Sequence, residues 1–198
     1  MKVHTYSDFV QFHEPSGLTN FYQFRKALSD AEIETIRELA KQTERQLGTA
    51  GGKVNPGYRS SRISWLYLDD STGWLYSKLG RMVKEANDAL WNFSLVGMSE
   101  AIQFGEYHAA DKGHYDWHID LGSQRFARRK ISVVIQLSDP DDYDGGDLEL
   151  QFAQAPQKIP RGKGFACLFP SYTIHRVTPV TRGVRRSLVI WVSGEPFR

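Results

Sequence analysis

Six short strand-like segments follow one another between about residue 98 and residue 193, and they constrain the fold more than any other feature of the chain. Each segment is rich in β-branched and aromatic residues, and turn-forming residues separate it from the next. The segments are SEAIQFGEY, HYDWHID, KISVVIQLSD, DLELQF, GFACLF and RRSLVIWV. Strands this short with brief connections favour an antiparallel double sheet of the sandwich or barrel type, and not a parallel nucleotide-binding sheet.

The first part of the chain carries a helical pattern. Ser29 and Glu32 fit a capping box, in which each side chain accepts a hydrogen bond from the other residue's backbone N–H. Apolar residues then recur on one helical face, which predicts a helix up to about Leu47. A second helix is predicted from about Ser71 to Trp91. Its apolar stripe consists of Leu75, Leu79, Met82, Val83, Ala86 and Leu90.

The segment between the two predicted helices is a glycine-rich loop over residues 48–57, followed by RISWLYL, which alternates like a short strand. We expect a single domain over residues 1–198. In this division, about 1–97 provide helical support and a gating loop, and about 98–193 form the β-sheet core.

Composition narrows the classes of partner and cofactor. The chain has 25 Lys and Arg against 23 Asp and Glu, and a net charge of +2 disfavours a general polyanion binder. Cys167 is the only cysteine, so a metal site has to use His and carboxylate ligands. The start MKVHTYSDF lacks the apolar segment of a secretory signal, and no apolar run approaches the roughly 18 residues of a membrane span. We therefore expect a soluble, cytoplasmic protein with no membrane partner.

An H-x-D pair forms the first candidate site. His118 and Asp120 lie on one predicted strand, whose period-two geometry places both side chains on the same face. His175 lies far along the chain, so two imidazoles and one carboxylate meet if the sheets fold face to face. This ligand set is the facial triad of non-haem Fe(II) oxygenases, and Zn²⁺ also accepts it. Arg185, ten positions beyond His175, can hold a carboxylate with two hydrogen bonds.

Strand parity leaves the choice between two adjacent arginines open. Arg185 and Trp191 share one face of their predicted strand, and Arg186 and Val192 share the other. Both faces carry apolar residues, so the pattern alone does not show which guanidinium points inward.

Three longer stretches resemble one known family. GHYDWHID, LSDPDDYDGGDLEL and FPSYTIHRVTPVTRGVRRSLVIW are similar to the Fe(II)/2-oxoglutarate-dependent dioxygenase superfamily, in particular to its prolyl-4-hydroxylase-like branch and the PKHD-type hydroxylases. The resemblance covers about residues 98–193. It implies a mainly β fold, namely a double-stranded β-helix (jelly roll) with N-terminal supporting α-helices.

The resemblance also implies roles for individual residues. His118, Asp120 and His175 match the iron ligands of the family, which makes them the expected metal and catalytic residues. Arg185 matches the residue that anchors 2-oxoglutarate, because the family's spacing from the second histidine selects it over Arg186.

Further contacts to the co-substrate are implied at four positions. Ser187 is a second donor to the carboxylate that Arg185 holds, and Tyr107 precedes the H-x-D pair as a co-substrate tyrosine does in prolyl hydroxylases. Gln136 falls where several relatives place a tyrosine near the distal carboxylate, so an amide would hold it here. Leu148 matches an apolar residue that packs on the methylene groups. The interior of the barrel is expected to be lined by Phe104, Trp117, Val133, Phe169 and Trp191.

The implied reaction uses Fe(II), 2-oxoglutarate and O2, with ascorbate as a candidate reductant. Oxidative decarboxylation gives succinate and CO2 and is coupled to hydroxylation of a peptide or protein side chain, proline first. The metal carries the difficult chemistry, while the protein orients the reactants and excludes water.

Two other functions stay open. One is nucleic-acid demethylation of the AlkB type, since Arg182, Arg185 and Arg186 make one strand basic. The low net charge and the lack of an aromatic and basic base-flipping segment disfavour it. The other is a non-enzymatic, cupin-like metal-binding module.

The substrate is suggested by two flanking segments. The 48–60 loop, which ends near Arg59, is a candidate lid over the site. The GSQRFARRK turn adds positive charge just after the predicted metal ligands and favours a substrate with an acidic flank. Its basic residues are Arg125, Arg128, Arg129 and Lys130.

Overall fold

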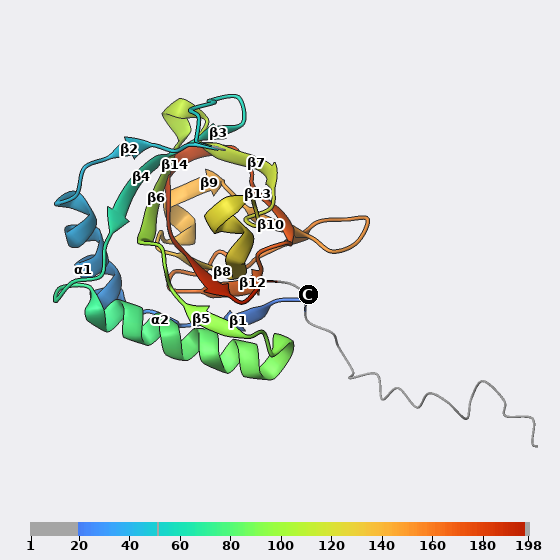
Figure 1. Ribbon diagram of the computed structural model, residues 1–198. Coiled ribbons are helices and arrows are strands. Elements are labelled where there is room, and N and C mark those ends of the chain that lie inside the picture. The colour runs from blue at the N-terminus through green and yellow to red at the C-terminus, as the bar shows by residue number, and fades with distance from the viewer. Residues whose placement is uncertain (1–19, 51, 197–198) are drawn as a thin grey trace, which may run out of the picture.

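The computed structural model describes residues 20–50 and 52–196, so the segment MKVHTYSDF and Gly51 of the predicted loop lie outside the described part. Within that part, two antiparallel sheets face each other and two helices lie along one side of the pair (Figure 1). This arrangement confirms the expected antiparallel double sheet. The division of the chain near residue 97 stays a prediction.

The larger sheet has nine strands. In spatial order its main path runs through β1 (Tyr22–Phe24), β12 (Ala166–Pro170), β8 (Arg129–Gln136), β14 (Val180–Gly194), β6 (Ile102–His108), β4 (Arg62–Leu66) and β2 (Gln46–Leu47). Both β5 (Leu95–Gly97) and β9 (Tyr143–Gly145) pair with β14 beside this path. β14 therefore occupies the middle of the sheet and connects most of its parts.

The smaller sheet has five strands and closes the other side. Its order is β11 (Gln157–Lys158), β10 (Leu148–Gln151), β13 (Ile174–Val177), β7 (His114–His118) and β3 (Arg59–Ser60). Among residues 20–50 and 52–196, three short 3₁₀ turns join strands: η3 (Ala109–Asp111), η4 (Gln124–Arg128) and η5 (Pro140–Asp142). β13 and β7 lie side by side with His175 opposite His118, and the pairing register shifts between His175 and Val177.

Helix α1 spans Asp30–Lys41, and its predicted capping box is confirmed. The backbone N–H of Ser29 donates to Glu32 Oε2 at 2.7 Å. The predicted end near Leu47 is wrong, because the chain leaves the helix after Lys41 and enters β2, where Leu47 pairs with Arg62 of β4. Pairing along the edge of the sheet thus takes the place of another helical turn.

Helix α2 spans Gly73–Ala86, and a π-helical turn, η2 (Asn87–Trp91), follows it. The wider turn rotates the apolar stripe, so Leu90 is exposed instead of buried as the helical period predicts. The Asn87 side chain closes the end: its amide donates to Phe93 O, and its oxygen accepts from the Phe93 N–H.

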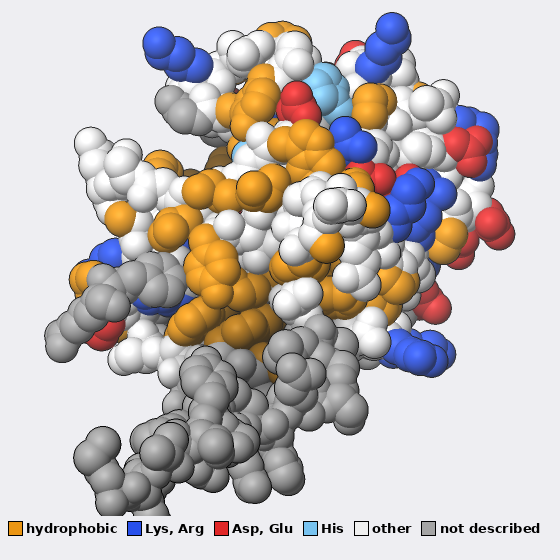
Figure 2. Space-filling view, turned by 90° about the vertical axis from the view of Figure 1, so that its right-hand side faces the viewer, with side chains coloured by type: hydrophobic (Ala, Val, Ile, Leu, Met, Phe, Trp, Pro, Cys, Tyr) orange, Lys and Arg blue, Asp and Glu red, His pale blue; other side chains and the backbone are white. Residues whose placement is uncertain are grey.

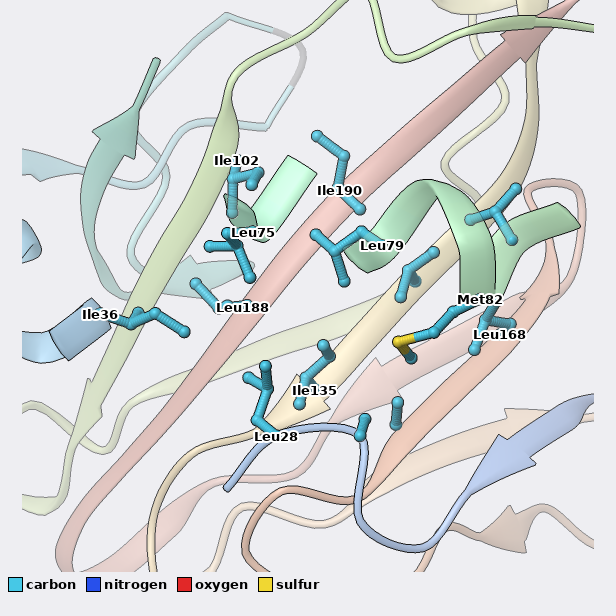
Figure 3. Close-up of a cluster of buried hydrophobic side chains, with 14 of the residues drawn as sticks. Leu28, Ile36, Leu75, Leu79, Met82, Ile102, Ile135, Leu168, Leu188 and Ile190 are labelled. Carbon is cyan, nitrogen blue, oxygen red and sulfur yellow. The ribbon is translucent and has the colours of Figure 1, made fainter. Parts of the chain in front are cut away.

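The main hydrophobic core lies between the helices and the larger sheet. Figure 3 shows Leu75, Leu79 and Met82 of α2 among side chains from the sheet strands, including Leu188 and Ile190. Phe104 and Val133 also belong to this core, which corrects their predicted place in the barrel interior. Strand parity is the reason, since their neighbours Gln103 and Val134 face the space between the sheets.

The remaining predicted lining residues divide between two surroundings. Trp191 lines the space between the sheets, and the Phe169 ring lies against the His175 ring at 4.9 Å between centroids. Trp117 instead lies under the Arg176 guanidinium, with 4.5 Å to its ring centroid, and is not among the residues that line the cavity.

The surface of the described residues mixes both signs of charge. On the face seen in Figure 2, Lys and Arg side chains lie beside Asp and Glu along the upper right, and apolar side chains form a band toward the lower left. Within the described part of the chain, no helix is long and apolar enough to span a membrane.

Candidate active site

A cavity of about 650 Å³ opens between the two sheets. Most of the residues predicted for the site line it. They are His118, Asp120, His175, Arg185, Tyr107, Ser187 and Leu148. Gln136 is buried beside the same cavity and reaches it through its contact with Arg185. The structure thus brings together residues from β6, β7, β8, β10, β13 and β14.

The first cluster in the cavity is formed by His118, Asp120 and His175, whose ligand atoms all lie within 4.8 Å of one another. The distance is 3.7 Å from His118 Nε2 to Asp120 Oδ1, and 3.5 Å from His175 Nε2 to Asp120 Oδ2. Asp120 lies two residues beyond the end of β7 and not on the strand as predicted. The backbone N–H groups of Asp120 and Leu121 both donate to Ser171 O at 2.9 Å, and these bonds hold the carboxylate in place.

Both imidazoles are oriented through their other ring nitrogen. His118 Nδ1 lies 2.7 Å from Asp116 O, and His175 Nδ1 lies 2.9 Å from Thr173 O. A carbonyl oxygen only accepts, so each Nδ1 carries the proton and donates it. In the neutral form of each ring, Nε2 then carries the lone pair and faces the centre of the cluster, as in metal-binding histidines.

The protonation states also suit a cation. Burial, together with the charge of His175, lowers the pKa of His118 to about 3, so that imidazole is neutral near pH 7. Burial acts to raise the pKa of Asp120, but His175, His118 and the Ser132 hydroxyl bring it below its ordinary value. Ser132 Oγ donates to Asp120 Oδ2 at 2.6 Å. The cluster thus combines the neutral His118 imidazole and the His175 ring with one ionised carboxylate.

Ser132 and Tyr115 were missed by sequence reasoning. Ser132 is on β8, between Ile131 and Val133 of the helix-side core, so alternation along that strand is the signal that places it inward. The Tyr115 ring stacks on the His118 ring at 3.5 Å between centroids. A spacing of three residues places Tyr115 and His118 on opposite faces of a regular strand, and a register shift in the pairing of β7 with β13 brings the two rings together, so the sequence pattern carries no signal for Tyr115.

Arg185 is the second buried feature of the cavity. It is 1% exposed, and its Nη2 donates to Gln136 Oε1 at 3.0 Å while its Nη1 lies 3.4 Å from Ser187 Oγ. Its Cζ is 5.2 Å from the centroid of the Tyr107 ring. Its Nε is buried without a hydrogen-bond partner, and among the described residues no carboxylate forms an ion pair with it. Arg186 lies on the other face of β14 and pairs with Glu106 at 3.0 Å.

A pair of glycines shapes the space around Arg185. Gly145 and Gly146 have φ of +69° and +62°, in the region that favours glycine. A Cβ on Gly146 would lie 2.9 Å from Arg185 Cδ and 2.9 Å from Val180 Cγ2. The DGG turn therefore makes room for the stem of the buried arginine.

Several known proteins are similar in sequence to this chain. The family model described as the 2OG-Fe(II) oxygenase superfamily matches residues 102–193. A PKHD-type hydroxylase of Teredinibacter turnerae is 42% identical over 172 residues, which cover 83% of this chain and 74% of the relative. A PKHD-type hydroxylase of Acidovorax ebreus is 38% identical over 178 residues, which cover 84% of this chain and 75% of the relative. The chain belongs to the 2OG-Fe(II) oxygenase superfamily.

Solved structures confirm the fold of this oxygenase. A Pseudomonas putida prolyl-4-hydroxylase matches with a TM-score of 0.68 and 22% identity, over 88% of this chain and 92% of that one. A Trichoplax adhaerens prolyl hydroxylase was solved with a hypoxia inducible factor peptide fragment. It matches with a TM-score of 0.75 and 20% identity, over 89% of this chain and 84% of that one. The mainly β, jelly-roll fold with N-terminal helices was predicted correctly.

Membership makes the protein an Fe(II)/2-oxoglutarate dioxygenase, and this outcome disfavours the non-enzymatic cupin-like alternative. The donor set fits both groups that the family implies. Two imidazole nitrogens and an ionised carboxylate converge on one point, which suits Fe(II). A buried guanidinium with a free Nε and only neutral neighbours suits the carboxylate of 2-oxoglutarate.

The basic turn of this oxygenase differs from its predicted role. Arg129 is buried, ion-paired with Glu100 and stacked on Trp191 at 3.8 Å from Cζ to the ring centroid. Lys130 is buried as well, and Arg128 lies 3.9 Å from Glu195. The side chain of Arg125 lies outside the described part. The charge of this turn is therefore largely compensated within the protein.

Arg59, at the end of the predicted lid, is in β3 and lines the same cavity. Its Cζ lies 4.5 Å from the centroid of the Tyr115 ring, on a residue that in turn stacks on His118. Nothing in the sequence pattern distinguishes Arg59 from the partly exposed Arg62 nearby.

Proposed function

We propose that this oxygenase hydroxylates a side chain of a peptide or protein, with proline as the favoured target and succinate and CO2 as coproducts. The observation that carries the proposal is that one cavity holds both a His-Asp-His cluster and a buried arginine with no acidic partner among the described residues. The first is suited to Fe(II) and the second to 2-oxoglutarate.

In this proposal His118, Asp120 and His175 hold Fe(II). The Nδ1 bonds to Asp116 O and Thr173 O prevent the imidazoles from turning, which keeps both Nε2 atoms on the metal side. Bound Fe(II) and 2-oxoglutarate supply the activation of O2, with ascorbate as a candidate reductant of the iron.

The co-substrate carboxylate lies at Arg185. Gln136 Oε1 and the Tyr107 ring hold the guanidinium in one orientation, so little side-chain entropy is lost when an anion binds. Ser187 Oγ offers a second donor to the same anion. Leu148, fully buried on β10, packs on the methylene groups and keeps water away from them.

A peptide or protein substrate is supported by two of the comparisons. The relatives are PKHD-type hydroxylases, and one structural neighbour is a prolyl hydroxylase solved with a peptide fragment. Exposed apolar side chains at the rim of the cavity, Leu47 and Ile119, offer contact area to an extended peptide.

Succinate release is the direct test. The full chain is loaded anaerobically with Fe(II) and 2-oxoglutarate, exposed to O2, and assayed for succinate and for a +16 Da product across a panel of prolyl peptides. We expect peptide-stimulated succinate in the wild type and in Arg182→Gln, whose arginine pairs with Asp144 away from the cavity. Arg185→Gln should lose it. Turnover of methylated nucleobases alone, or no succinate from any peptide, would overturn the proposal.

A further inference from the structure

The charged side chains that line the cavity include more arginines than acidic residues. Three arginines face it, Arg59, Arg129 and Arg185, together with two acids, Glu100 and Asp120. Glu100 pairs with Arg129, and Asp120 lies in the proposed iron site. Under the proposed function the co-substrate supplies the anion for Arg185. Arg59 is then the one arginine of the three with no anion assigned to it.

Arg59 is 8% exposed, and its hydrogen bonds all go to neutral acceptors. Its Nε donates to Ser61 Oγ at 2.9 Å, Nη1 to Thr49 O at 2.9 Å and Nη2 to Gln103 Oε1 at 3.2 Å. Among the described residues no carboxylate forms a salt bridge with it. A guanidinium has five N–H donors, so two are left for a ligand. A buried cation without a counter-ion is costly, which is a reason to expect an anionic partner.

The position of Arg59 separates it from the co-substrate anchor. Arg59 donates to Gln103, whereas Arg185 lies over Tyr107, and these two contacts are four residues apart on one face of β6. Four residues of an antiparallel strand span about 13 Å. Arg59 also stacks over Tyr115, which in turn stacks on His118. Its charge thus lies near the proposed iron site and at a different part of the cavity from Arg185.

We propose that Arg59 binds a carboxylate of the substrate, so that the oxidised side chain is flanked by an acidic residue. This inference rests on the proposed function and specifies its substrate. It assigns the acidic preference to Arg59 and not to the 125–130 turn, whose charges are largely compensated. A single guanidinium next to neutral groups matches one negative charge, whereas a phosphate dianion would leave a second charge buried and unpaired.

The test is a comparison of matched peptides. N-acetylated, C-amidated pentapeptides with a central proline carry either Glu or Gln at one flanking position, and their binding to the Mn(II)- and 2-oxoglutarate-loaded full chain is measured by calorimetry. At one flanking position the Glu peptide should bind the wild type at least about tenfold more tightly than its Gln match, the size of one charge-assisted hydrogen bond. In Arg59→Gln this difference should fall to within about twofold.

Two variants control for other effects of the substitution. Arg182→Gln removes an equal charge from an exposed side chain outside the cavity. It should keep the tenfold difference in affinity between the Glu and Gln peptides. Arg59→Lys keeps a cation and should retain part of the preference. In Arg182→Gln, which lies outside the cavity lining, the 2-oxoglutarate Kd and the succinate formed without peptide should also stay within about twofold of the wild type.

The outcomes separate this inference from the proposed function. If the wild type forms no succinate with or without peptide, the proposed function fails. If succinate forms but the Glu and Gln peptides bind equally tightly, or neither peptide binds, then Arg59 does not bind a carboxylate of the substrate. The same conclusion follows if Arg59→Gln keeps the full preference, or if Arg182→Gln loses it as Arg59→Gln does.

Discussion

Replacing Gly146 with alanine should weaken co-substrate binding through the stem of Arg185. The added Cβ would lie 2.9 Å from Arg185 Cδ, so the arginine has to move, and with it the donor that holds Gln136. We expect a loss of about 1–3 kcal/mol in the free energy of unfolding, from the positive φ and the crowded side chains. Displacement of one charge-assisted hydrogen bond should raise the 2-oxoglutarate Kd about tenfold.

The neighbouring glycine provides a contrast. A Cβ on Gly145 would lie 2.1 Å from the backbone oxygen of Pro179, which cannot move without disturbing the pairing of β9 with β14. Gly145→Ala should therefore lose more stability than Gly146→Ala. Gly80→Ala, in α2 with open space around it, should stabilise the helix by roughly 0.5–1 kcal/mol and leave 2-oxoglutarate binding unchanged.

Urea unfolding and calorimetric titration of 2-oxoglutarate into the Mn(II)-loaded protein measure the two effects separately. A Gly146→Ala protein that is destabilised but binds 2-oxoglutarate as the wild type does would refute the coupling between the turn and Arg185. A protein with unchanged stability would show that the crowding is relieved without cost.

Three further outcomes are expected. His175→Ala should remove most of the affinity for Fe(II) or Mn(II), and unchanged metal stoichiometry in a titration would show that the proposed ligand set is wrong. Arg185→Gln should raise the 2-oxoglutarate Kd far more than Arg186→Gln, because Arg186 lies on the other face of β14, and equal losses would contradict this assignment. Burial raises the pKa of Tyr115 to about 12, so the fold loses about 2 kcal/mol as pH rises from 10 to 12. Tyr115→Phe should reduce this fall of the unfolding free energy between pH 10 and 12. An unchanged dependence on pH would contradict the raised pKa of Tyr115.

Local patterns in the sequence predicted the elements whose stability is local. The capping box of Ser29 and Glu32 starts α1 as expected, and the apolar stripe of α2 is buried up to Ala86. His118 and Asp120 were grouped by their spacing of two residues, although Asp120 lies beyond the end of β7 and is held there by hydrogen bonds to Ser171 O. The long-range meeting with His175, and the inward side of Arg185, came from resemblance to a family and not from parity.

The errors arise where tertiary structure decides. Leu47 leaves the helical pattern because an edge strand needs a partner, and Leu90 turns outward because a π-helical turn changes the period. Val133 looks like a barrel residue by composition, but the helices cover the face on which it lies. The sequence does not show that the charge of Arg129 is paired, because its partner Glu100 comes from a distant segment.

The central place of β14 determines when the larger sheet can form during synthesis of the chain. β6 and β8 both leave the ribosome before β14, yet in the folded protein they lie on either side of it. Until residues 180–194 emerge, each has an unpaired strand edge, which is the kind of surface that recruits other chains. The larger sheet therefore cannot be completed before residues 180–194 have emerged, and a nascent chain halted before residue 180 should bind chaperones and aggregate when released.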